Sequence, residues 1–321
     1  MIRHFSQITR AAGVFSLGAA FLVGTPVLRA QAAPELEFHS GSAGGSFLPY
    51  AQAASQVITE SGVASVEAVE SGGSNANLAA IEESDTVLAT VFLGSANAAA
   101  NGTGAFDGTP TMNTRALFPM YMTSFQIAAR VDAGIGAFMD LDGRRVGAGP
   151  AGGPAENYLT ALAEVVGISP VIVNASSAEH VDQMVAGEIE ALWQGASVPV
   201  PAIVASAEQT DAIVFGLTDD EIEAMLDLFP FMAPTEVAPG VYPGQSDPIH
   251  SVAAWNFVMT SSEMSDELAY QITSAVLSRD DLEEVLPLLA LTRAENAVSN
   301  RIIQFHPGAI RYYEEVGVAL P

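Results

Sequence analysis

Three glycine-rich segments constrain the fold of this chain more than any other feature. They cover residues 41–46, 70–78 and 141–154, and each lies between a short apolar segment and a helical pattern. Glycine allows a sharp turn where a strand meets a helix, and it lets backbone amides approach a bound group. In open α/β sheets such turns lie at the carboxyl ends of strands, where ligands bind. The pattern therefore predicts an α/β fold with a ligand site at the strand ends.

Short strand patterns and amphipathic helix patterns alternate along the chain. The expected strands are 36–40, 65–70, 86–92, 124–129, 145–147, 189–193, 212–215 and 250–259. The expected helices include 47–61, 74–83 and 154–166, a helix opened by a capping box of Thr218 and Glu221, and one capped by Ser265. This rhythm predicts α/β lobes with mainly parallel sheets. A chain of this length exceeds the usual single-domain size, so we expect two lobes.

The first 32 residues have the pattern of a secretory signal peptide. Arg3 and Arg10 flank the start of an apolar run over 11–23, and Ala30 and Ala32 supply the small residues of a cleavage site. Cleavage is expected after Ala32, with the following bond as the alternative. The apolar run is shorter than the roughly 20 residues that a membrane span needs. We therefore expect a periplasmic protein without direct membrane insertion.

The charge balance excludes two classes of partner. The chain has 37 acidic residues against 11 basic ones, and a formal net charge of −26. Every basic residue is arginine, and cysteine is absent. A strongly negative field repels nucleic acid and anionic lipid, so neither is an expected partner. Disorder is the alternative interpretation of high charge, but a hydrophobic content of 49% argues against it.

The first two glycine turns supply most of the candidate ligand-binding residues. Backbone amides at a helix start favour an anionic or acceptor oxygen, although a tight turn without a ligand explains each motif equally well. Ser74 and Asn75 also have a simpler role as helix caps. No lysine follows the first turn, so it is not a nucleotide P-loop. The candidates are Gly44, Gly45, Ser46, Phe47, Ser71, Gly73, Ser74, Asn75 and Asn77.

The remaining candidates lie later in the chain. The third turn supplies Ala151, Gly152 and Gly153. Phe92 and Trp193, which end expected strands, and Tyr242, which lies among turn-forming residues, are also candidates. Core packing is at least as good an interpretation for Trp193.

The C-terminal segment predicts a short helix. Pro307 stands early in it, Gly317 stands at its end, and His306 is expected to cap it. With the three glycine turns, this segment resembles the TAXI family of TRAP-transporter solute-binding proteins, four motifs occurring in the same order. The resemblance implies a two-lobed type II periplasmic binding protein with a hinge, which delivers a small solute to membrane permease subunits.

The resemblance also implies a carboxylate solute, because glutamate and related dicarboxylates are associated with the family. Phe47, Phe92, Ala151 and Gly153 replace polar residues of the family pattern, so a less polar monocarboxylate is an alternative to glutamate or a 2-oxoglutarate-like acid. Arg115 and Arg130 could clamp a carboxylate, although in so acidic a protein a structural ion pair is the better explanation for each. The expected lobes are 34–118 with 249–321, and 119–248.

Enzyme motifs are lacking in the sequence. There is no H-E-x-x-H, no cysteine nucleophile and no G-x-S-x-G elbow, so we expect no enzyme activity, cofactor or metal. Two alternatives remain. One is a periplasmic ligand-sensing adaptor of the same fold, which would lack a closed cleft. The other is a serine hydrolase using Ser42 or Ser46, which would need a histidine within hydrogen-bond reach.

Overall fold

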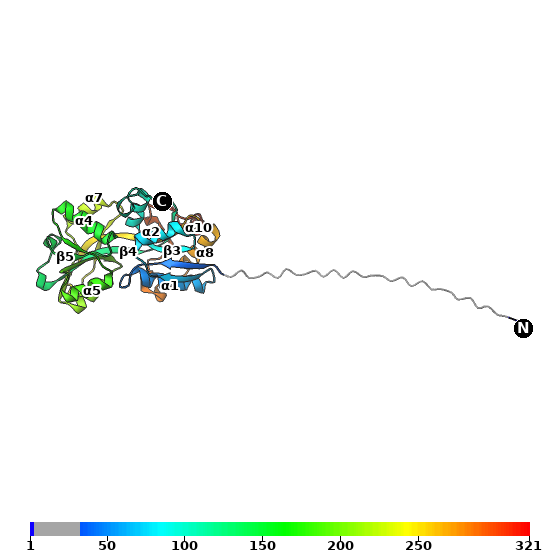
Figure 1. Cartoon of the computed structure of the whole chain (residues 1–321), viewed down its shortest axis with the longest axis horizontal. Coiled ribbons are helices and arrows are strands. Elements are labelled where there is room, and N and C mark those ends of the chain that lie inside the picture. The colour runs from blue at the N-terminus through cyan, green and yellow to red at the C-terminus, as the bar shows by residue number, and fades with distance from the viewer. Residues whose placement is uncertain (3–32) are drawn as a thin grey trace. The chain divides into compact units, whose positions relative to one another are not determined.

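The computed structural model describes residues 1–2 and 33–321 (Figure 1). The expected signal peptide lies outside the described residues apart from its first two, so it stays a prediction. Over residues 33–321, no helix is long and apolar enough to cross a membrane.

Ten strands and ten α-helices form the described fold. The strands are β1 (Glu35–His39), β2 (Ser65–Val69), β3 (Val87–Phe92), β4 (Thr114–Arg130), β5 (Arg145–Gly147), β6 (Val171–Val173), β7 (Ala191–Ala196), β8 (Ala212–Phe215), β9 (Ala233–Val237) and β10 (Ile249–Ser261). The helices are α1 (Phe47–Glu60), α2 (Ser74–Glu83), α3 (Leu93–Asn101), α4 (Pro154–Val166), α5 (Ser177–Ala186), α6 (Pro201–Gln209), α7 (Asp219–Leu228), α8 (Asp266–Leu277), α9 (Leu282–Val285) and α10 (Pro307–Glu315).

Two long neighbouring strands, β4 and β10, run through the middle of the sheet. The strand order is β2-β1-β3-β10-β4-β7-β5-β6, with β8 also paired to β4 and β9 to β10. The pairs β1–β2, β1–β3, β5–β6 and β5–β7 are parallel. The pairs that involve β4 or β10 are antiparallel. The α/β prediction is confirmed, and the two long strands make the sheet mixed.

The sequence predicted only part of these two strands. Residues 124–129 and 250–259 were expected, whereas β4 begins ten residues earlier at Thr114. Pro119 argues against a central strand because it has no N–H for the ladder. In the structure, Pro119 lies opposite Phe257, beside a register shift between Trp255 and Phe257. The irregularity allows the strand to continue past the proline.

Separate hydrophobic cores pack on the two ends of the sheet. The first core joins residues between Leu36 and Tyr121 with residues between Phe257 and Tyr313. The second core joins residues between Phe125 and Met232 with Phe92, Val252 and Ala254, and a smaller cluster around Ile203 adjoins it. In Figure 1, α1, α8 and α10 lie with the first core, and α4, α5 and β5 with the second.

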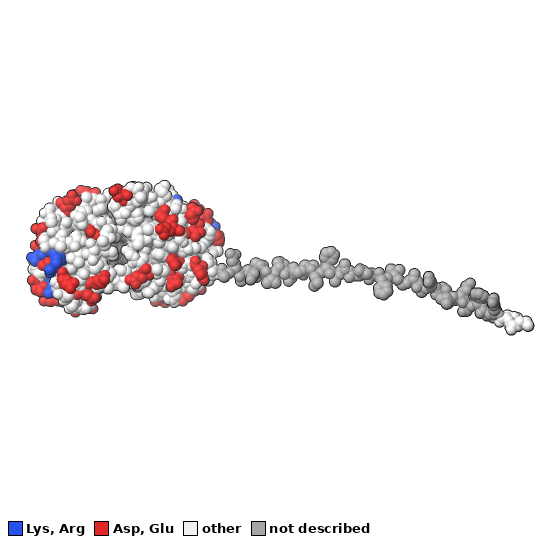
Figure 2. Space-filling view, in the orientation of Figure 1, with Lys and Arg blue, Asp and Glu red and all other residues white. Residues whose placement is uncertain are grey.

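The lobe boundaries stay a prediction. The expected divisions at 118/119 and 248/249 fall within β4 and at the start of β10. Figure 2 shows acidic side chains spread over both halves of the face in view, with arginines gathered mainly at one end.

Three helices, α7, α8 and α10, begin at the capping residues that the sequence predicted. The Glu221 amide donates to Thr218 Oγ1 at 3.4 Å, and the Thr218 amide donates to Glu221 Oε2 at 2.8 Å. The Leu268 amide donates to Ser265 Oγ at 3.3 Å.

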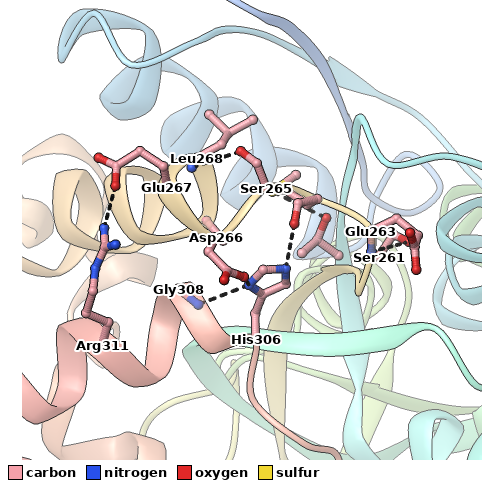
Figure 3. Close-up of polar contacts among 12 residues, drawn as sticks. Ser261, Glu263, Ser265, Asp266, Glu267, Leu268, His306, Gly308 and Arg311 are labelled. Atoms are coloured by element: carbon pink, nitrogen blue, oxygen red, sulfur yellow. Dashed lines mark hydrogen bonds and ion pairs between the residues drawn. The ribbon is translucent and has the colours of Figure 1, made fainter.

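His306 caps α10, as expected. Its Nδ1 accepts from the Gly308 amide at 3.2 Å, and its Nε2 donates to the Met264 carbonyl at 3.0 Å (Figure 3). One side chain thus joins the starts of α8 and α10, and Arg311 adds a bond of 2.8 Å to Glu267.

Candidate functional site

The three glycine turns meet at one cavity of about 130 Å³. At the ~30 Å³ that one water takes up in the liquid, this volume corresponds to about four waters or a solute of similar size. The turns contribute Gly41, Ser42, Gly45, Ser46, Phe47, Gly72, Gly73, Ser74, Gly149, Pro150, Gly153, Pro154 and Ala155. Strand and helix residues complete the lining with Phe92, Tyr121, Thr123, Phe125, Ser177, Gln194, Gly195 and Ala196. The cavity therefore lies between the two cores.

The N-termini of three helices point their first turns at this cavity. Helices α1, α2 and α4 have Ser46, Gly73 and Gly153 at the N-cap, and none of these positions caps its helix with a side chain. Gly73 has φ +86°, a conformation that favours glycine. The first amides of a helix have no intrahelical partner and carry a partial positive charge. Together they suit a carboxylate or another acceptor oxygen.

The side chains around the cavity are neutral. Its lining contains hydroxyl, amide, apolar and aromatic groups but no arginine, lysine, aspartate or glutamate. Ser46 Oγ lies 2.7 Å from Ser197 Oγ, which joins the start of α1 to the loop after β7. Burial raises the pKa of Tyr121 well above its ordinary value, so its phenol stays neutral. An anion here would rest on helix amides and hydroxyls alone.

The two arginines considered as carboxylate clamps lie elsewhere. Arg130 Nη2 is 2.6 Å from Asp132 Oδ2, and its Nη1 donates to the Met184 carbonyl at 2.9 Å. This is the structural ion pair that the sequence left open. Arg115 donates to the carbonyls of Met112 and Thr114 at 3.0 and 2.9 Å. Neither arginine lines the cavity.

Seven of the expected site residues line the cavity. They are Gly45, Ser46, Phe47, Gly73, Ser74, Phe92 and Gly153. Contact of these residues with a solute stays a prediction.

Asn77 lies behind the cavity. It is fully buried, and its Nδ2 donates to the carbonyls of Ser40 and Thr90, each at 2.7 Å. Its Oδ1 accepts from Ser71 Oγ at 2.6 Å. These bonds tie the segments that follow β1 and β2 to β3. Asn77 and Ser71 therefore shape the turns without lining the cavity, and their direct contact with a solute stays a prediction.

Four other candidates lie at the edges of the turns and do not line the cavity. Asn75 Nδ2 donates to the Gly152 carbonyl at 2.8 Å, a bond that joins the second turn to the third. A Cβ at Gly44 would lie 3.1 Å from the Ala178 amide nitrogen, so the first turn closely approaches α5. Ala151 is exposed beside Gly152. These residues are placed to hold the turns together.

Trp193 and Tyr242 belong to the cores and do not line this cavity, and their contact with a solute stays a prediction. Trp193 is fully buried and stacks on Phe125 with a centroid distance of 5.4 Å. The Tyr242 hydroxyl donates to Gln126 Oε1 and accepts from the Val200 amide, both at 2.9 Å. Burial raises the pKa of Tyr242 to about 12.

Several lining residues were not anticipated from the sequence. Tyr121, Thr123 and Phe125 come from β4, whose first half was not expected to be a strand. Gln194 follows Trp193 in β7. An alternation of apolar and polar residues could have revealed the first half of β4. It is absent because both faces of the strand are buried and apolar.

His180 supports the third turn from behind. It is fully buried, and its Nε2 accepts from the Gly149 amide at 3.0 Å. An amide can only donate, so Nε2 is unprotonated and Nδ1 donates to Gln183 Oε1 at 2.9 Å. Burial lowers the pKa of His180, which favours this neutral form. In the sequence His180 is an isolated histidine, and its contact with the third turn was not predicted.

The serine-hydrolase alternative required a histidine beside Ser42 or Ser46. Within residues 33–321, no hydrogen bond joins either serine to a histidine, and the partners of Ser46 are Ser197 and Tyr121.

The model of the NMT1-like family matches residues 38–317. The chain belongs to this family. Similar solved structures include MatC (Rpa3494) from Rhodopseudomonas palustris with bound malate, with 15% identity, a TM-score of 0.58, and coverage of 91% of this chain and 98% of that one. The periplasmic binding protein BugD has 12% identity and a TM-score of 0.57, covering 90% and 99%. R. palustris Rpa4515 with adipate has 13% identity and a TM-score of 0.56, covering 89% and 94%. The chain therefore has the two-lobed fold of periplasmic binding proteins.

Proposed function

We propose that this chain is the periplasmic solute-binding receptor of a TRAP transporter of the TAXI type. In this proposal it captures a small organic acid in the cavity and delivers it to membrane permease subunits. The observation that carries the proposal is the convergence of three helix N-termini without side-chain caps on one cavity. The carboxylates in the MatC and Rpa4515 structures support the same solute class. A ligand-sized cavity between the two cores also favours a receptor over a ligand-sensing adaptor.

The proposed solute has one carboxylate and a less polar body. Helix N-termini can hold one carboxylate, while Phe47, Phe92 and Ala155 offer apolar surface to the rest of the molecule. A second carboxylate would lie among neutral side chains. Burying a charge without a partner costs several kcal/mol, so dicarboxylates such as glutarate should bind more weakly. Glutamate and 2-oxoglutarate-like acids would meet the same penalty.

We also propose that the chain is processed during export and that its two lobes move. Residues 1–32 would be removed during export, and lobes of 34–118 with 249–321 and of 119–248 would close over the solute. β4 and β10 cross between the cores and would form the hinge.

Calorimetry on the purified mature protein tests the solute class. Glutarate and pentanoate have the same carbon chain and differ by one carboxylate. We expect pentanoate to bind more tightly and to raise the melting temperature, because a ligand bound only by the native state stabilises it. Tighter binding of glutarate would show that a second charge is accommodated. If neither these acids nor a wider panel of carboxylates and amino acids stabilises the protein, the proposed function is wrong.

A further inference from the structure

A second cavity, of about 390 Å³, lies beside the first. Its lining includes Gly94, Asn97, Tyr158, Phe229 and Phe231, and it shares Pro154 with the first cavity. Aromatic and small side chains dominate the side that faces the first cavity. The second cavity thus offers apolar volume close to the candidate solute site.

Packed aromatic rings separate the two cavities, with Phe92 on the side of the first and Tyr158 and Phe231 on the side of the second. Phe92 lines the first cavity, and its ring centroid lies 5.8 Å from that of Tyr158 and 6.2 Å from that of Phe231, which both line the second. Phe125 lies 6.0 Å from Phe92 on the side of the first cavity. All three contacts with Phe92 are edge-to-face, the geometry that aromatic rings prefer. Phe92 is therefore the central ring of the partition.

The backbone holds Phe92 in this place. It is the last residue of β3, and its amide donates to Ser74 Oγ at 3.0 Å. Two residues later, a Cβ at Gly94 would overlap the Tyr158 hydroxyl and lie 2.8 Å from the Phe231 ring. The absence of a side chain at Gly94 lets Tyr158 and Phe231 close against Phe92. Only 2% of the Phe92 surface is exposed.

We propose that Phe92 sets the maximum length of the solute by closing the first cavity against the second. This inference rests on the proposed function, because it assumes that an acid binds with its carboxylate at the helix N-termini. The body of such an acid would extend toward Phe92 and stop there. Replacing the ring by a methyl group would extend the first cavity as far as Tyr158 and Phe231, so a longer chain would fit.

Phe92→Ala tests this proposal with a series of linear acids. Calorimetry would compare butyrate, hexanoate, octanoate and decanoate for the native protein and the variant. We expect native affinity to fall steeply beyond the short acids, and Phe92→Ala to gain about tenfold or more for octanoate. A crystal structure of the variant with octanoate should show the tail in the space that the Phe92 ring occupies in the native protein.

Two further variants control the test. Phe229→Ala enlarges the second cavity without removing a ring that packs on Phe92, so it should leave the preference for chain length unchanged. Phe92→Val opens a smaller gap and retains a β-branched side chain in β3, so it serves if Phe92→Ala does not fold.

Failure of this inference can be distinguished from failure of the proposed function. An unchanged length preference in folded Phe92 variants would overturn the role of Phe92 while leaving the proposed function in place. If the native protein binds no acid of the series and no other carboxylate, both the proposed function and this inference are wrong.

Discussion

Asn77→Ala should destabilise the protein far more than the same change at Asn75, although both asparagines lie in the first turn of α2. Asn77 is fully buried and makes two bonds of 2.7 Å to carbonyls and one of 2.6 Å from Ser71 Oγ. Asn75 is half-buried and makes one bond of 2.8 Å to Gly152 at the surface. The pair therefore compares a buried network with an exposed contact.

The size of the effect follows from the bonds that are lost. A buried neutral hydrogen bond contributes about 1 kcal/mol, and an acceptor left without a partner adds to the loss. Three bonds at Asn77 predict a decrease of about 3 kcal/mol in the free energy of unfolding. At ~2–4 °C for each kcal/mol, the melting temperature should fall by about 6–12 °C. Asn75→Ala should cost about 1 kcal/mol or less.

Urea denaturation and calorimetric melting of both variants measure these differences. The variant at Asn77 should also bind solute more weakly, because its side chain fixes the turns at Ser40 and Ser71. Equal stability losses in the two variants would refute the reasoning that the Asn77 network organises the site.

Two other predictions concern the turns themselves. A Cβ at Gly45 would meet only the Ser42 carbonyl oxygen, at 3.4 Å, so Gly45→Val should fold normally but block the cavity and reduce affinity at least about tenfold. Unchanged calorimetric affinity in the folded variant would contradict this. Because burial lowers the pKa of His180, its contribution to stability should be complete above the unfolded pKa of about 6.5 and decline as the pH falls below it. The difference in unfolding free energy between native protein and His180→Gln should therefore shrink from about pH 7.5 to about pH 5.5; a constant difference would rule out this role.

Much of the fold could be predicted from local patterns. Short strands ending at glycine turns, helix caps such as Thr218 and Ser265, and the terminal helix capped by His306 all depend on neighbouring residues. The same local logic identified the three turns at the cavity. It was less successful for β4, because Pro119 is tolerated only through its pairing with β10, which lies far away in the sequence.

The candidate site was predicted at the level of segments and less well at the level of side chains. Asn77 and Trp193 lie next to the correct segments, but their side chains point into the protein. Whether a polar residue near a glycine turn contacts the solute or supports the turn depends on burial, which its neighbours in sequence do not reveal. His180 illustrates the same limit, since its partner Gly149 is 31 positions away.

If the proposed hinge lies in β4 and β10, the floor of the cavity is part of that hinge. Tyr121, Thr123 and Phe125 line the cavity from β4. Opposite them, Asn256 Nδ2 donates to the Tyr121 carbonyl at 2.7 Å and to Thr123 Oγ1 at 2.9 Å, beside the irregular register at Trp255. Any rotation of one core relative to the other bends these strands and warps the surface under the solute. A solute that fits this surface closely would therefore oppose bending of the two strands. A closer fit should then also give a longer residence time.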